Sequence, residues 1–138
     1  NVTIGNPYKN PHVNRPYDVG AYVPPEHPLT GVSRMMRCVD EMQQAHPDLP
    51  VVGSSFSYLR PCSPDLAAGM VAGGHCQMAG FGRMAFAYPD FAKTIVRGEA
   101  LSPGKCCIAC GQCALVRRAG GPAGCVVRGP AYGRGKDA

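Results

Sequence analysis

The stretch QMAGFGRMAFAYPDFAKTIVRG, residues 77–98, reads as one strand, a turn and a helix. Its opening residues 77–81 form a short, largely apolar strand that runs into the turn Gly82-Arg83. Pro89 then opens a segment that stops at Gly98, and proline near the start with glycine past the end is typical of a helix. The stretch therefore predicts a βα unit with a glycine turn at the carboxyl end of its strand.

The same alternation extends upstream of this unit. Residues 1–5 and 49–53 predict short buried strands, and 64–71 predicts a helix. The clearest helix covers 31–46, where apolar side chains recur at helical spacing and predict a core face made of Val32, Met35, Met36, Val39 and Met42. Strands that alternate with helices favour a parallel sheet with helical crossovers. Three such units are too few for a closed barrel, so we expect further strands from an N-terminal segment or another chain.

A polar stretch over residues 6–29 separates the first strand from the first helix. Its prolines are dense enough to exclude helix and central strand. Loops of this length in compact domains are usually functional, so we expect a lid or wall over the active site, with His12 and Tyr8 as candidate substrate contacts. The alternative is a surface excursion held by polyproline-type segments.

Downstream, the run CIACGQCALVRRAGGPAGC, residues 107–125, holds four cysteines. Cys107, Cys110 and Cys113 follow one another at intervals of three, and Cys125 comes after eleven further residues. Three thiols at that pitch can cover one face of an inorganic core, while the glycine-rich loop returns the fourth to the other side. This spacing favours an iron–sulfur cluster. Zinc, which also binds four cysteines, is the rival, and Cys106 could replace Cys107 as a ligand.

Composition narrows the class of protein further. The chain has 138 residues, about one domain, and its 45% apolar content argues against disorder. Clustering among the eight cysteines indicates metal or redox work in a reducing cytoplasm rather than a disulfide framework. No apolar run approaches the roughly 18 residues of a membrane span, so we expect no membrane partner. The net charge is +5, but aromatic residues are few after Phe91, so we expect no nucleic-acid partner.

The two glycine turns that follow the strands, at 53–57 and 80–83, are candidate phosphate sites. In parallel βα arrays, ligands bind at the carboxyl ends of strands. Backbone N–H groups in such turns can cradle a phosphate, and Arg83 would add a charge-assisted contact. The alternative for each is a tight turn, in one case with a surface arginine.

Taken together, these motifs resemble a known family. The run GFGRMAFAYPDFAKTIVRGE, residues 80–99, resembles the last strand and following helix of the Old Yellow Enzyme-like NADH:flavin oxidoreductases. The cysteine quartet resembles the iron–sulfur branch of that family, which includes 2,4-dienoyl-CoA reductase and trimethylamine dehydrogenase. Residues 1–18 are similar to the sixth strand and loop of the same barrel.

The resemblance implies an α/β fold: the C-terminal portion of a (β/α)8 TIM barrel, comprising its last three βα units, followed by a cysteine-rich iron–sulfur segment. Residues 1–103 would form part of the FMN-binding barrel, and 104–138 the four-cysteine segment and tail. Where relatives often carry glycine after the seventh strand, this chain has Ser54-Ser55. The resemblance implies that the FMN phosphate is bound by the backbone at Ser55, Phe56, Gly82 and Arg83. It also implies that the ligands of the [4Fe–4S] cluster are Cys107, Cys110, Cys113 and Cys125.

The activity implied is an FMN- and [4Fe–4S]-dependent reduction of an activated C=C bond, of the enoate or 2,4-dienoyl-CoA type, with NAD(P)H as electron donor. The substrate would be a small enone or enoyl-CoA, and the resemblance places the family's substrate-binding His or Tyr pair and its proton donor on the first five strands, outside this chain. We therefore expect this portion alone to be inactive. Two alternatives stay open: an iron–sulfur electron-transfer partner subunit, and a zinc-stabilised structural module.

Overall fold

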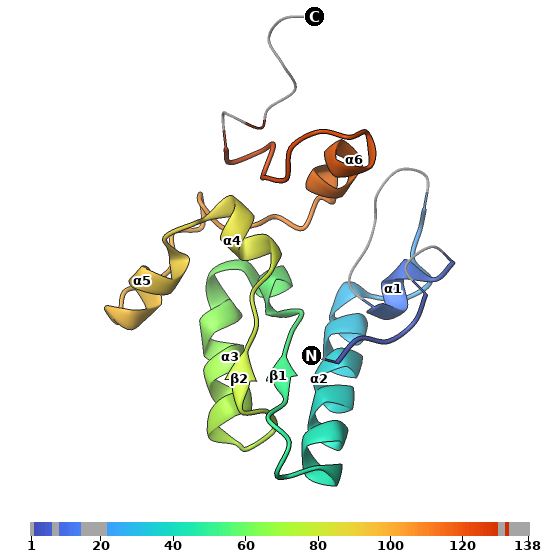
Figure 1. The fold of residues 1–138 in the computed structure, drawn as a ribbon, viewed down its shortest axis with the longest axis vertical. Helices are drawn as coiled ribbons and strands as arrows, with labels where there is room; N and C mark the ends of the chain where they lie inside the picture. Colours follow the sequence, from blue (N-terminus) through green and yellow to red (C-terminus); the bar gives the residue numbers. More distant parts are fainter. Residues whose placement is uncertain (1, 7–8, 15–21, 130–131, 133–138) are drawn as a thin grey trace, which may run out of the picture.

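The computed structural model describes residues 2–6, 9–14, 22–129 and 132 (Figure 1). Two strands, β1 (Val52–Gly53) and β2 (Met78–Ala79), pair in parallel, with Val52 opposite Met78 and Gly53 opposite Ala79. Helix α2 (Pro28–Ala45) packs beside β1, and α3 (Ser63–Ala72) packs beside β2. The expected parallel pairing of the strands within 49–53 and 77–81 is thus present, connected through a helix.

Helix α2 confirms the helix expected over 31–46, with its start a few residues earlier. The ring nitrogen Nδ1 of His27 accepts a hydrogen bond from the Leu29 N–H at 3.2 Å, which caps the helix, and Pro28 occupies its first turn. The buried Gln43 ties the other end to the sheet. Its side-chain oxygen accepts a hydrogen bond from the Val51 N–H at 3.3 Å, at the entry to β1.

The main core lies where α2, α3 and the strand pair meet. Four of the five apolar residues expected on the core face of α2 are buried, whereas Met42 is 40% exposed. Phe56, at the start of the 3₁₀ segment η1 (Phe56–Cys62), is completely buried in the same cluster. The apolar face of α2 therefore packs into the core, except at Met42, which lies beyond it.

A second apolar cluster supports the C-terminal segment. It joins α4 (Arg83–Ala87) and the region of α5 (Phe91–Val96) to the buried Leu101, Cys106 and Cys107. Phe81 contacts both clusters, with its ring centroid 5.6 Å from that of Phe56 and 5.2 Å from that of Phe91. The cysteine-rich segment is consequently packed onto the unit that follows β2.

Two expectations for the N-terminal part were wrong. The described residues 2–5 form no strand, because none of the described segments pairs with them, although Val2 and Ile4 pack against the main core. Within the proline-rich stretch, Pro11–Asn14 forms the short helix α1. Proline did not exclude helix there because Pro11 stands at the first position, where its missing N–H costs nothing.

Beyond the predicted elements, the cysteine segment contains a helix of its own, α6 (Gln112–Arg118). In Figure 1 it lies above α4, at the end of the molecule remote from the base of α2. Among the helices of the described ranges, none combines the length and the apolar character that crossing a bilayer demands.

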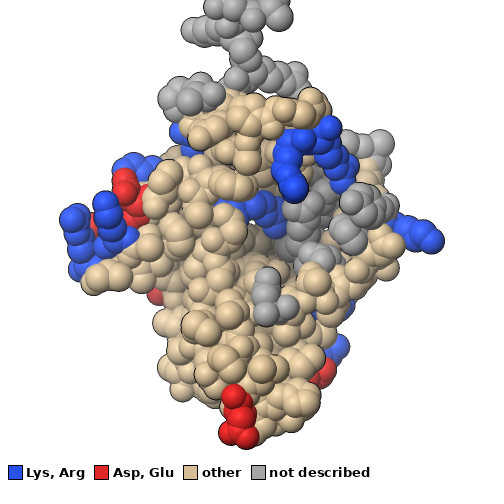
Figure 2. Space-filling model, viewed as in Figure 1, with Lys and Arg blue, Asp and Glu red and all other residues tan. Residues whose placement is uncertain are grey.

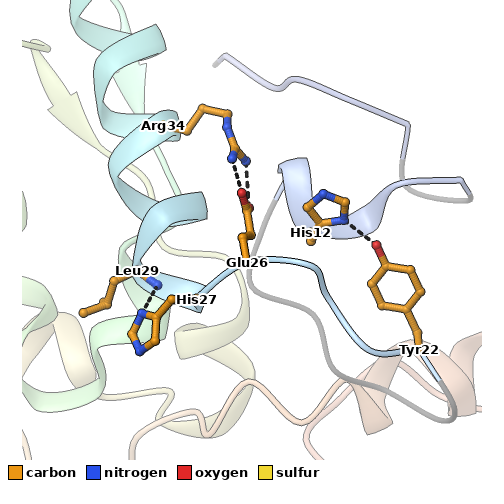
Figure 3. A network of polar contacts seen from close by, with 6 residues as sticks. All are labelled: His12, Tyr22, Glu26, His27, Leu29 and Arg34. Carbon is orange, nitrogen blue, oxygen red and sulfur yellow. Dashed lines mark hydrogen bonds and ion pairs between the residues drawn. The ribbon is translucent and has the colours of Figure 1, made fainter.

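The chain that enters α2 is held by a polar network (Figure 3). Arg34 binds both carboxylate oxygens of Glu26, with one of the two contacts at 2.9 Å, and His12 contacts the hydroxyl of Tyr22. The hydrogen bond from Arg34 holds the pKa of the Glu26 carboxyl below its usual range. These contacts fix residues 22–27 against the first turns of α2.

This ion pair gives an expected pH dependence of stability. Because the folded-state pKa of Glu26 is lowered, its stabilisation is present above the unfolded-state pKa and is lost as the pH falls through the folded one. Glu26→Gln should lower the free energy of unfolding by about 0.5–1 kcal/mol near neutral pH, and by almost nothing well below the lowered pKa. Urea unfolding at several pH values measures this; a pH-independent difference would contradict it. Glu41→Gln, in an exposed pair, is the control.

Candidate metal and cofactor site

The two glycine turns lie at the same edge of the strand pair. The Gly80 N–H donates to the Gly53 carbonyl at 2.7 Å, so the chain leaves both strands side by side. Ser55 adopts a left-handed backbone conformation, with φ 75°, in the turn after β1. The Phe56 ring is directed into the core, so only its backbone is free to serve as the sequence predicts.

Gly82 and Arg83 connect this edge to the cysteine segment. A Cβ added at the exposed Gly82 would meet no heavy atom within 4 Å, so the glycine leaves open space beside the turn. Arg83 is the first residue of α4, and its partly buried side chain lines the same small pocket as the cysteines. Arg83 thus joins the turn after β2 to the pocket that the cysteines line.

All four cysteines expected as cluster ligands line that pocket. Cys107 is anchored in the second apolar cluster, and Cys113 lies in the first turn of α6. Between them, Ala109 and Gly111 take left-handed φ values of 57° and 73° on either side of Cys110, so the chain winds tightly there. The cysteines that share the pocket are Cys107, Cys110, Cys113 and Cys125.

Glycines return the chain to the pocket at Cys125, as the spacing predicts. A Cβ at Gly121 would lie 2.6 Å from Cγ1 of Val116, against the last turns of α6. A Cβ at Gly124 would lie 2.3 Å from the Tyr132 ring. Both approaches are closer than a side chain tolerates, so these two glycines permit the path that places the fourth cysteine.

Backbone N–H groups are directed at two of the sulfurs. The Ala109 N–H donates to Cys107 Sγ, and the Arg128 N–H donates to Cys125 Sγ, each at 3.3 Å. Burial raises the pKa of the Cys107 thiol, and the nearby Cys113 and Cys125 raise it further. The Ala109 hydrogen bond and the Arg83 charge act in the opposite direction on that pKa. Such donors stabilise negative charge on cluster sulfurs.

The neighbouring Cys106 has a different environment. It is completely buried, and its thiol donates to the Ser102 carbonyl oxygen at 3.3 Å. Burial raises the pKa of this thiol as well. Of the two adjacent cysteines, Cys107 is therefore the one that lines the pocket, which favours it over Cys106 as the ligand.

The arrangement of the sulfurs bears on which inorganic group would fit. Within the part of the chain that the structure describes, no three His, Cys, Asp or Glu side chains converge closely enough to hold one metal ion. Zinc needs such convergence, because its four ligands bind one ion at about 2.3 Å. In an iron–sulfur cluster the thiolates bind different irons and surround a larger core. The donor set that lines this pocket, four thiols, is the set that a [4Fe–4S] cluster binds, and zinc can also bind four cysteines.

Sequence reasoning missed one contributor to this pocket and part of the role of another. Arg128 belongs to none of the motifs in the sequence, yet it contacts Cys125 and lines the pocket. Arg83 was expected only at a phosphate. Its position beside the cysteines depends on how residues 101–107 pack on α4, which no local motif encodes. Of the expected loop contacts, His12 pairs with Tyr22, and Tyr8 lies outside the described residues.

All eight cysteines are free thiols in the structure. Comparisons with family models, with curated proteins and with solved structures each found no match.

Proposed function

We propose that the chain is the C-terminal part of an Old Yellow Enzyme-like oxidoreductase that uses FMN and a [4Fe–4S] cluster. The observation that carries the proposal is the single pocket lined by Cys107, Cys110, Cys113 and Cys125. These residues would be the cluster ligands. The cluster, bound by these cysteines, would supply one-electron transfer. FMN, bound at a neighbouring site, would supply hydride transfer to the substrate.

The flavin site is proposed at the edge formed by the two strand-end turns. Backbone N–H groups at Ser55, Phe56, Gly82 and Arg83 would hold the FMN phosphate, with the Arg83 guanidinium as a charged donor. Open space beside Gly82 and the adjacent parallel strands support this assignment. Because Arg83 also lines the cysteine pocket, the two cofactors would be neighbours across a single residue.

The wider assignment follows from the same resemblance. The substrate would be a small molecule with an activated C=C bond, an enone or an enoyl-CoA, and NAD(P)H would be the electron donor. The barrel would be completed by strands from an N-terminal segment or another chain. The clustered free cysteines favour a reducing, cytoplasmic location.

Arg83→Ala tests the flavin assignment. Loss of a charged hydrogen bond should weaken FMN binding by roughly 1.5–3 kcal/mol, about 10- to 150-fold in Kd. The measurement is fluorescence titration of the deflavinated full-length protein with FMN. Arg97→Ala removes an exposed arginine at the end of α5 and should leave Kd unchanged.

Two outcomes would contradict the flavin site. An unchanged Kd in Arg83→Ala would exclude this guanidinium from the phosphate. Equal losses in both arginine variants would indicate only a general effect of charge.

Anaerobic NADH and NADPH oxidation with an enone acceptor, compared with a saturated analogue, then tests the proposed reaction: only the enone should be consumed.

A further inference from the structure

Arg128 connects the two ends of the cysteine segment. Its backbone N–H donates to Cys125 Sγ at 3.3 Å, and its side-chain Nε donates to the carbonyl oxygen of Cys106 at 3.4 Å. The residue also lines the pocket that the four cysteines share. One residue thus fastens the loop that carries the last cysteine to the chain that carries the first.

The charge on this side chain has no acidic counterpart nearby in sequence, and it forms no ion pair among the described residues. No Asp or Glu occurs between residues 100 and 136. None of the ion pairs among the described residues includes Arg128 or Arg83, the other cation that lines the pocket. On the face shown in Figure 2, the upper end of the described molecule carries blue side chains and no red ones. The pocket is therefore bordered by uncompensated positive charge.

Positive charge beside a cluster favours the state that carries the extra electron. A [4Fe–4S]²⁺ core with four thiolates has a total charge of −2, and reduction by one electron makes it −3. The change is the gain of one electron by the core, with no bond broken. Hydrogen bonds to sulfur and nearby charges are the means by which a protein adjusts this potential. A partly buried cation acts more strongly here than an exposed one, because solvent screens it less.

We propose that Arg128 is a positioning residue that raises the reduction potential of the cluster, through its charge and by clamping the Cys125 loop to Cys106. This inference rests on the proposed cluster. Arg128 lies outside the ligand set and makes two separable contributions: the backbone N–H to Cys125, which glutamine or lysine at this position retains, and the guanidinium, which these substitutions remove.

The test is a dithionite titration of the anaerobically purified full-length protein, followed by electron paramagnetic resonance, with iron and sulfide assayed alongside. At the wild-type midpoint, Arg128→Gln should lower the ratio of reduced to oxidised cluster roughly tenfold, which is 59 mV for a one-electron couple. Arg128→Lys keeps the charge and should stay near the wild-type potential. Arg117→Gln removes an exposed charge on α6 that does not line the pocket, and it should shift the potential far less.

The outcomes separate the inference from the proposal beneath it. An Arg128→Gln protein with full iron and sulfide and an unchanged midpoint overturns the inference alone, as does an equal shift in Arg117→Gln. If Arg128→Gln fails to retain iron, Arg128→Lys decides: a wild-type midpoint supports the inference, and a lowered one overturns it. Wild-type protein without iron and sulfide overturns the cluster itself, and this inference with it.

Discussion

Replacing Cys110 with serine is expected to abolish assembly of the iron–sulfur cluster while leaving flavin binding largely intact. Cys110 is the central thiol of the run and lines the common pocket between two left-handed residues. Serine matches cysteine in size, but its hydroxyl is a poor ligand for iron. The protein holds the irons of a cluster through cysteine thiolates. Iron and acid-labile sulfide should fall to background in the full-length protein, and the broad visible absorbance of the cluster should disappear.

The control for this substitution is Cys62→Ser. Cys62 is an exposed free thiol outside the pocket, so its replacement should leave iron, sulfide and flavin unchanged. Full iron content in Cys110→Ser would remove Cys110 from the ligand set. Loss of both cofactors in that variant would instead show that the cysteine segment is required for the fold of the flavin site.

The largest effect on stability is expected at Met35. Its side chain is 1% exposed and packs in the main core between α2, α3 and the strand pair. Met35→Ala would remove apolar contacts and leave a cavity, and such truncations cost about 2–5 kcal/mol. Urea unfolding should show this loss as a lower midpoint with an unchanged slope.

Met42 provides a matched control on the same helix. It is 40% exposed, so Met42→Ala should change the free energy of unfolding by less than about 0.5 kcal/mol. Similar losses of stability in the two variants would show that Met42 packs in the core as the apolar spacing predicts, and not at the surface as in the structure. Met35→Ala with almost no loss would contradict the main core as described.

The part of the fold that local periodicity encodes could be predicted from the sequence. Helices α2 and α3 were expected from apolar spacing and proline starts, and the strands from short apolar runs that end at glycine. The strand expected over 1–5 failed because a strand exists only through a partner, and an apolar run does not specify one. Helix α6 was missed because its short sequence is dominated by the cysteine spacing.

The cysteines of the candidate site could be predicted from the sequence, but the arginines beside them could not. Cysteine spacing alone indicated four thiols around one core, and the structure brings all four to one pocket. The arginines were not predictable as members of that pocket. Arg83 reaches it because Cys106 and Cys107 pack onto α4, and Arg128 because the glycine-rich loop returns the chain to Cys107. Both are consequences of tertiary packing.

The most direct test of the central claim, a [4Fe–4S] cluster beside FMN, is metal and sulfide analysis of the full-length protein purified without oxygen. The account predicts about four iron and four sulfide per chain, no stoichiometric zinc, a brown protein and one bound FMN released on denaturation. Colourless protein with stoichiometric zinc, and with neither iron nor flavin, would contradict it and leave a zinc-stabilised structural module.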